Sequence, residues 1–341
     1  MFLLVFSSGT VFAQSSMLAT LSHDGEITVF YGANALKEAH AAATHGDAIT
    51  LSSGSFNAVD ITKAITLRGA GMDVDTLKNT YPTIINGDFS IIIGDSVNEK
   101  LTIEGIYNNF TITISKGLSN ATFMKSRLYG VSFRTLKNGA IHCNNRFIHC
   151  KVVDYLHLFS SIDFTFVNSY ISDCPNYDCN SAFANCIILR GLPAFTNSTF
   201  YNCIFIGNPD ATTSNSSNVL DKTCQAYNCI ATNVLTDSDD PSDRNYVFKH
   251  MTNPSNVAIC LMKSVFKTFT YNNYTDNETF ELLDEIKSKY KGTDGTQIGL
   301  HGGALPFSSR TTNPQITKCN VASHSTADGK LCVEIEVTAG E

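Results

Sequence analysis

A six-residue unit, Phe-x-Asn-Cys/Ser-x-apolar, recurs through the middle of the chain and constrains its fold more than any other feature. Copies begin at Phe123, Phe147, Phe166, Phe183 and Phe200, and a variant begins at Ala226. Successive copies start 17 to 26 residues apart. Repetition at such a period predicts a solenoid in which each unit occupies the same place on successive coils.

The order of residue types within the unit follows from strand geometry. Residues two apart in a strand face the same way, so the Cys or Ser and the apolar residue two positions later share the inner face. Coils stacked about 4.8 Å apart then form interior columns of Phe, of Cys or Ser, and of aliphatic residues. The Asn is expected in a left-handed turn, with its amide bonded to the Asn of the next coil. The cysteines of this column are therefore expected to be buried thiols rather than a redox or metal site: Cys150, Cys186, Cys203 and Cys229.

Segments outside the repeat show a resemblance to a known fold family. A helical stripe over residues 33–44 is followed by two runs of alternating apolar and polar residues, 47–56 and 61–71. This succession resembles the N-terminal cap and first coils of pectate-lyase-like right-handed parallel β-helix proteins, and residues 291–303 resemble the final coil of secreted bacterial members. The resemblance implies an all-β fold, a single-stranded right-handed parallel β-helix with an N-terminal capping helix and an irregular C-terminal region.

The same reading divides the chain into four parts. Residues 1–13 are expected to be the remnant of a secretory signal peptide, because an apolar run ends in small residues at alternate positions. Residues 14–45 form an N-terminal segment with the capping helix, 46–303 the parallel β-helix, and 304–341 a linker and a strand that could start a truncated module. A secreted, extracellular or cell-surface protein is expected.

Net charge and hydropathy limit the kinds of partner that the chain is expected to bind. The net charge of -7 offers no general field for the nucleic-acid backbone, so nucleic-acid binding is not expected. No later run approaches the roughly 20 consecutive apolar residues of a membrane span. We expect a monomer.

The residue after each Cys or Ser points away from the core and forms an outward column along the solenoid. In chain order its members are Arg127, Lys151, Tyr170, Ile187, Ile204 and Ile230. Three stacked isoleucines are not expected to remain exposed. We therefore predict that the chain after Thr232, including a helix over residues 278–289, packs over them.

The early half of this column is the candidate ligand site. Arg127 and Lys151 could pair with uronate carboxylates and Tyr170 could stack on a sugar, so an extracellular polysaccharide is a possible partner. Other members of the candidate site by register are Asp154, Asp173 and Arg190. In the β-helix lyases that the chain resembles, Lys or Arg abstracts the proton next to a uronate carboxylate, which makes Lys151 and Arg127 the candidate catalytic residues. A solvated strand face explains the same pattern without any ligand.

Possible metal sites and disulfides are few. An acidic loop could bind calcium, but it lacks the Gly and terminal Glu of an EF-hand, so a solvated turn is the preferred explanation and no cofactor is expected: Asp237, Asp239, Asp240 and Asp243. Zinc at two His/Cys pairs, 142–143 and 149–150, matches no common finger spacing. The expected disulfides are Cys174–Cys179 and then Cys319–Cys332.

Three functions remain open on the sequence alone. A noncatalytic glycan-binding or cell-surface protein is preferred, because the catalytic motifs of β-helix enzymes are absent: Asn-Thr-Asp, Gly-His-Gly, Arg-Ile-Lys and Arg-x-Pro-x-x-Arg. A polysaccharide lyase or glycoside hydrolase acting on an acidic polysaccharide is the second, with a lyase preferred. A structural or adhesive solenoid is the third. The fold alone cannot choose among them.

Overall fold

The structure is a computed structural model in which most of the chain can be described. The described residues are 17–74, 81–94, 98–137, 139–174, 177–178, 180–189, 195–206, 220–233, 248, 255–261, 264–268, 275–276 and 278–338. The expected signal remnant, the acidic loop, Arg190 and Cys179 lie outside them.

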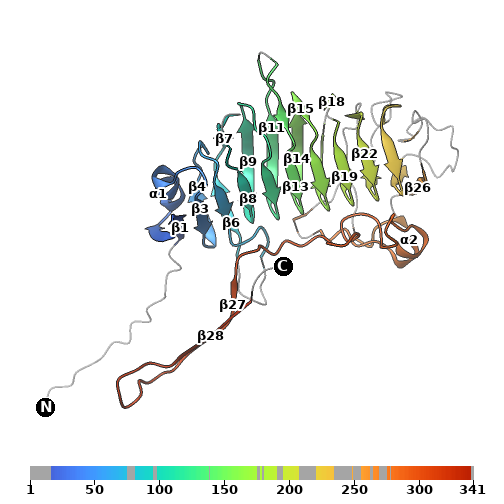
Figure 1. Ribbon diagram of the computed structural model, residues 1–341. Helices are drawn as coiled ribbons and strands as arrows, with labels where there is room; N and C mark the ends of the chain where they lie inside the picture. Colours follow the sequence, from blue (N-terminus) through green and yellow to red (C-terminus); the bar gives the residue numbers. More distant parts are fainter. Residues whose placement is uncertain are drawn as a thin grey trace.

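Two 11-stranded sheets form the walls of a parallel β-solenoid (Figure 1). The first sheet runs in the order β2 (Glu26–Tyr31), β1 (Leu18–His23), β3 (Ala48–Leu51), β5 (Thr66–Arg68), β8 (Thr102–Glu104), β10 (Thr122–Met124), β13 (Arg146–Ile148), β16 (Thr165–Val167), β19 (Ala182–Ala184), β22 (Thr199–Tyr201) and β24 (Gln225–Tyr227). The second runs in the order β26 (Ala258–Leu261), β25 (Ile230–Asn233), β23 (Ile204–Ile206), β20 (Ile187–Leu189), β17 (Tyr170–Ile171), β14 (Lys151–Leu158), β11 (Arg127–Phe133), β9 (Ile106–Ile114), β6 (Thr83–Asn86) and β4 (Gly54–Asn57), with β7 (Phe89–Ile91) paired to β9.

The repeat unit occupies the same place on each coil, as the sequence predicts. Five phenylalanines are register partners on successive strands of the first sheet: Phe123, Phe147, Phe166, Phe183 and Phe200. Their rings stack with centroids 4.5 to 5.1 Å apart. The four column cysteines are completely buried beside them. Interior columns of Phe and of thiols are thus confirmed.

The third position of the unit is a left-handed corner in every copy. Positive φ angles between 44° and 56° occur at Lys125, His149, Asn168, Asn185, Asn202 and Asn228. The expected bond between successive Asn amides is absent in this column, because a later segment supplies the acceptors: Asn168 Nδ2 donates to the carbonyl oxygens of Leu300 (2.7 Å) and Gly302 (2.8 Å). A coil-to-coil Asn bond does form at another corner, from Asn144 to Asn120.

The N-terminal end of the solenoid carries a short helix and a hairpin. Helix α1 (Ala35–Ala42) is shorter than predicted and buries Leu36 and Ala39 against the core. Strands β1 and β2 pair antiparallel and extend the first sheet beyond β3, which the sequence analysis did not anticipate. The end of the sheet is therefore closed by both elements.

Three long strands turn from the second sheet onto a third face. In β9, β11 and β14 the register shifts between Leu128 and Gly130, where β9 and β14 each have one more residue than β11. Such a bulge bends the sheet. After it, Val131 and Phe133 point into the core while Gly130 and Ser132 lie on the outer side. The bend is the most irregular part of the otherwise regular wall.

A C-terminal strap, defined here as the described residues between 264 and 313, runs back along the solenoid (Figure 1). It starts beside the last strands and includes helix α2 (Asp284–Lys289), which covers only the second half of the helix predicted over 278–289. Asn228 Nδ2 donates to Lys291 O (2.9 Å) at one end, and Asn313 Nδ2 donates to Gly69 O (2.9 Å) at the other. The final coil expected at residues 291–303 is thus replaced by chain that lies alongside the coils.

A two-stranded antiparallel hairpin follows the strap and projects from the solenoid (Figure 1). Strand β27 (Gln315–Val321) pairs with β28 (Val333–Thr338), close to the strand predicted near the C-terminus. Cys332 is a free, exposed thiol, so the predicted Cys319–Cys332 disulfide is wrong. The Cys174–Cys179 pairing stays a prediction, because Cys179 lies outside the described residues.

Candidate functional site

The outward column exists in the register that the repeat predicts. Its six members are direct partners on successive strands, from Arg127 on β11 to Ile230 on β25. The column continues towards the N-terminus through Tyr107 on β9. Charged, aromatic and aliphatic residues therefore succeed one another along one line of the second sheet.

The aliphatic half of the column is covered, which confirms the sequence prediction. Ile187, Ile204 and Ile230 are buried. The residues that pack with them come from the strap and form a second apolar core outside the coils: Val265, Phe266, Phe280, Leu282, Ile286, Ile298 and Leu300. The chain after Thr232 thus stabilises the outer surface of the solenoid.

Arg127 lies beneath the same strap and is only 8% exposed. Its Nε donates to Asp276 Oδ1 at 2.9 Å, and its Nη1 donates to Asn108 O at 3.2 Å. The guanidinium carbon lies 4.6 Å from the centroid of the Tyr107 ring, within the range of a cation–π contact. The Tyr107 hydroxyl donates to Asp276 as well, at 2.9 Å. Intramolecular contacts therefore surround this cation.

Lys151 and Tyr170 also lie beneath the strap. Lys151 is 5% exposed; its Nζ donates to Asp276 O at 3.0 Å and lies 3.8 Å from an Asp73 carboxylate oxygen. The Tyr170 ring stacks on Phe280 with centroids 4.7 Å apart. The strap thus occupies the surface that a ligand of these three side chains would use, and their role in binding or catalysis stays a prediction. Neither Arg190 nor the four loop aspartates can be placed, because they lie outside the described residues.

The histidines proposed as zinc ligands have other neighbours. His142 Nε2 lies 3.0 Å from Arg134 O, and His149 Nε2 lies 3.1 Å from Leu305 O. Cys150 belongs to the interior thiol column. Among the described residues, no three His, Cys, Asp or Glu side chains are grouped so that they could hold a metal ion.

Accessible aromatic side chains gather instead where the long strands bend. We call this group the bend cluster, and its members are Phe110 on β9, Tyr129 on β11, and Asp154, Tyr155 and His157 on β14. Phe110 and Tyr129 are exposed to 38% and 39%, and the other three are half-buried. Three adjacent coils contribute to the cluster, so a rigid sheet fixes the positions of its members.

The Tyr155 side chain crosses the neighbouring strand, and a glycine makes this possible. Its hydroxyl is 2.7 Å from Thr111 Oγ1, two strands away. Between them, a Cβ added to Gly130 would stand 2.5 Å from Tyr155 Cζ, closer than any side chain tolerates. The His157 ring stacks on Tyr155 with centroids 4.6 Å apart. The absence of a side chain at residue 130 thus allows an aromatic platform on the outer surface.

Acidic groups border this platform. Asp154 lies close enough to the Tyr129 hydroxyl to raise the pKa of Tyr129. Asp88 accepts the Thr111 amide hydrogen at 2.7 Å, and Asp173 lies close enough to act on His157 electrostatically. Burial lowers the pKa of His157, and Asp173 opposes that change. The imidazole is therefore uncharged at neutral pH.

Asp154 and Asp173 were expected from the sequence at the candidate ligand site, whereas the aromatic members of the bend cluster were not. Residues 155–159 alternate polar or aromatic side chains with leucines, and the leucines point into the core. That alternation placed Tyr155 and His157 on the outer face. The platform itself could not be foreseen, because it depends on the bulge that brings Gly130 beside Tyr155.

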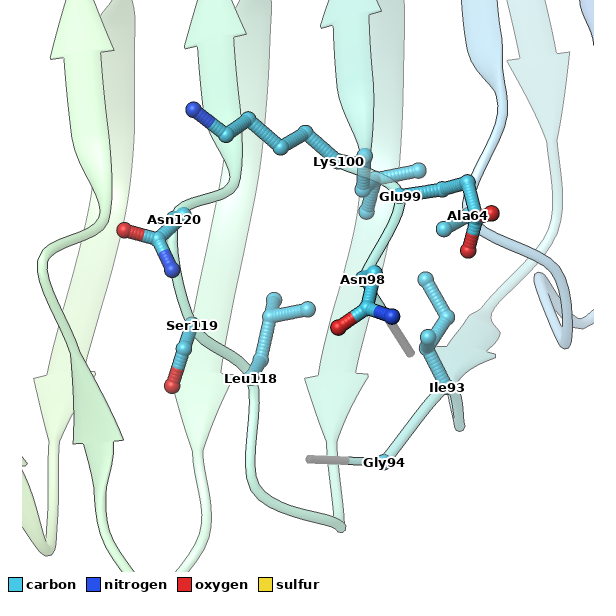
Figure 2. A pocket seen from close by; sticks show the side chains of 10 residues that line it. Ala64, Ile93, Gly94, Asn98, Glu99, Lys100, Leu118, Ser119 and Asn120 are labelled. Atoms are coloured by element: carbon cyan, nitrogen blue, oxygen red, sulfur yellow. The ribbon is translucent and has the colours of Figure 1, made fainter. Parts of the chain in front are cut away.

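A small cavity lies elsewhere, between coils near residues 93–120 (Figure 2). Its volume is about 220 Å³, and polar side chains including Asn98, Glu99, Lys100 and Asn120 line it. Figure 2 shows Lys100 extending across its rim and Glu99 at the opposite side. No aromatic side chain lines this cavity. The bend cluster therefore offers the better surface for a sugar ring.

Comparisons of the chain with protein-family models, with curated proteins and with solved structures found no match. Within the part of the chain that the structure describes, no helix is long and apolar enough to cross a membrane. A function has to be inferred from the chain's own side chains, and the bend cluster combines accessible rings with carboxylates.

Proposed function

We propose that the protein binds glycans without catalysis, outside the cell or at its surface, and that the bend cluster is the binding site. The observation that carries the proposal is the pair of exposed rings, Phe110 and Tyr129, on a bend that the Tyr155 side chain crosses. Exposed aromatic rings held on a rigid surface suit the apolar face of a sugar. Carboxylates beside them can accept hydrogen bonds from sugar hydroxyls.

Rigidity also favours this surface. Tyr155 is held at both ends, by its strand and by the contact of its hydroxyl with Thr111. A side chain that is already ordered loses little conformational entropy when a ligand binds. Because the cluster extends over three coils, it can contact more than one sugar of a chain.

The lyase alternative depends on an accessible Lys151 or Arg127. Both cations are buried and bonded to Asp276 of the strap. A base of that kind would require the strap to leave the surface, which would also expose Tyr170. The geometry therefore favours binding over catalysis.

The test is a binding panel of neutral, acidic and amino-sugar oligosaccharides, measured by calorimetry alongside an assay for unsaturated and reducing-end products. We expect retention without products. Tyr129→Ala and Tyr155→Ala should each weaken binding strongly, and Gly130→Ala should do the same because the new Cβ displaces the Tyr155 ring.

Tyr201→Ala is the matched control. Tyr201 is exposed to 40%, almost the same as Tyr129, but it lies on the first sheet away from the bend. Binding that survives in Tyr155→Ala and Gly130→Ala would overturn the assignment of the site. Absence of binding to every glycan on the panel would overturn the function.

A further inference from the structure

We propose that two copies of the protein pair end to end, by joining their β2 strands antiparallel across a twofold axis at Val29. Strand β2 lies beside β1 at the N-terminal end of the solenoid and is the last strand of the first sheet (Figure 1). The hairpin covers the core at this end, but in the part of the chain that the structure describes β1 is the only strand paired with β2. The pairing would continue the first sheet from one copy into the next, in place of the monomer expected from the sequence.

The outer face of β2 carries a row of large apolar side chains that are open to solvent. We call this row the outer stripe; it consists of Ile27, Val29 and Tyr31, which are exposed to 69%, 40% and 65%. Thr28 and Phe30 alternate with them on the other face, where Phe30 packs against the core. An apolar row on the last strand of a sheet indicates a surface that contacts another protein molecule.

The backbone of the outer stripe faces the open edge of the sheet. Gly32 N donates to Met17 O at 2.7 Å between β2 and β1, and Ser52 N donates to Leu18 O at 3.0 Å between β3 and β1. Hydrogen bonds along an antiparallel strand alternate from one side to the other. The even-numbered residues of β2 therefore bond to β1, and each residue of the outer stripe directs its N–H and its C=O away from the sheet.

A twofold axis at Val29 satisfies the side chains and the backbone in one register. Val29 then lies opposite the same residue of the second copy, and Ile27 lies opposite Tyr31. Directly opposite residues of an antiparallel pair share a face, so the two outer stripes form one apolar row. The same pairs are the hydrogen-bonded ones, so each outward N–H meets a carbonyl oxygen. Glu26 lies opposite Gly32, and no like charges meet.

The other exposed hairpin does not offer the same contact. Strand β28 also carries an exposed apolar row, Val333, Ile335 and Val337. In the corresponding register Glu334 would lie directly opposite Glu336 of the second copy, and like charges at that distance oppose pairing. Strand β2 has neither Pro nor Lys, the residues that commonly block a sheet edge, and its one charge is at its first residue. A second copy is therefore the partner that the sequence of β2 fits.

The dimer is expected to be weak and closed. One strand of six residues per copy buries less than the roughly 1,200–2,000 Å² of stable complexes. We therefore expect a dissociation constant on the order of tens of micromolar. Because a twofold axis uses the open edge of both copies, association should stop at two.

Sedimentation velocity of the full chain from about 1 to 300 µM measures the association, and circular dichroism verifies that each variant folds. The natural chain should change from monomer to dimer over this range. Val29→Lys should weaken the dimer by at least about tenfold, because two lysines would face each other at the axis. Val29→Pro should also weaken it, because it removes an outward N–H and leaves the bonds to β1.

Val321→Lys is the matched control. Val321 is exposed to 57% on the hairpin of β27 and β28, so this variant should dimerise like the natural chain. A monomer at every concentration would overturn the pairing, as would a dimer that Val29→Lys leaves unchanged. A dimer weakened by Val29→Lys but not by Val29→Pro would overturn the joined sheet. A dimer lost in Val321→Lys would overturn the assignment of the contact to β2.

Discussion

The cover over the outward column can be tested at one ring, that of Phe280. This side chain is 1% exposed, stacks on Tyr170 at 4.7 Å and meets Phe266 edge-on at 6.1 Å. Its backbone is left-handed, with φ of 53°, and its N–H donates to Glu278 Oε1 at 3.0 Å. Phe280→Ala keeps the Cβ and therefore the backbone strain, so the substitution isolates the loss of the ring.

The magnitude follows from what the ring contacts. Replacing a fully buried Phe by Ala costs about 3–5 kcal/mol, of which roughly 0.5–1.5 kcal/mol belongs to each well-placed aromatic pair. Phe280→Leu keeps most of the apolar volume and should cost about 1–2 kcal/mol. Other strap residues, such as Leu282 and Ile298, still pack on the isoleucines in either variant. The strap should loosen rather than detach.

Urea unfolding and limited proteolysis measure the effect. Phe280→Ala should lower the free energy of unfolding by the stated amount and should speed cleavage within the strap before the sheets are cut. Leu305→Ala is the control, because Leu305 lies on the same segment but is 72% exposed. If Phe280→Ala unfolds and is cleaved like Leu305→Ala, the strap does not cover the column in solution.

Three other predictions concern the core, a corner and the N-terminal end. Burial raises the pKa of Cys150 to about 12. An aromatic disulfide reagent at pH 8 should therefore leave Cys150 unmodified, whereas Cys332→Ser should remove one fast-reacting thiol. Rapid labelling at Cys150 would contradict its burial. Asn202→Ala should lower the free energy of unfolding in urea by about 2–3 kcal/mol, because Ala is strained in a left-handed turn and lacks the amide that bonds the strap. Asn202→Gly loses the same bonds without the strain and should cost less. Equal losses in the two variants would refute the strain. The His23 ring donates a hydrogen bond to the Asp47 carboxylate, which raises the pKa of His23. The contribution of this pair to stability is therefore complete below pH 6.5 and is lost as the pH rises through the raised pKa. The thermal midpoint should show this loss in the natural chain and not in His23→Gln.

The regular coils could be predicted because the six-residue unit shows which of its side chains face the core and which face outward. Phe166 and Cys186 each identify an inner column, and the residue after each Cys identifies the outer one. Even the need to cover Ile204 followed from the pattern, since three stacked isoleucines are rarely left in water. Local periodicity sufficed wherever neighbouring coils repeat the same contacts.

The path of the strap and the fate of the cations could not be predicted in the same way. Asp276 lies 149 residues from Arg127 in a stretch without periodicity, so nothing in the sequence identified it as the partner of that cation. The strap binds the corners through carbonyl oxygens, such as those of Leu300 and Gly302, which any residue type can provide. The burial of the early column therefore emerged only from the tertiary structure.

The length of the strap has a consequence for how the chain reaches its native state. In most solenoids each repeat contacts only its neighbours, so coils can form one after another during synthesis. Here the coils at Gly69 and at Asn228 are both completed by residues that follow all the coils in the sequence and are synthesised after them. A growing chain would present the stacked isoleucines and unpaired corner amides to solvent until those residues emerge. The interval before closure is when this protein is most exposed to aggregation and most dependent on chaperones.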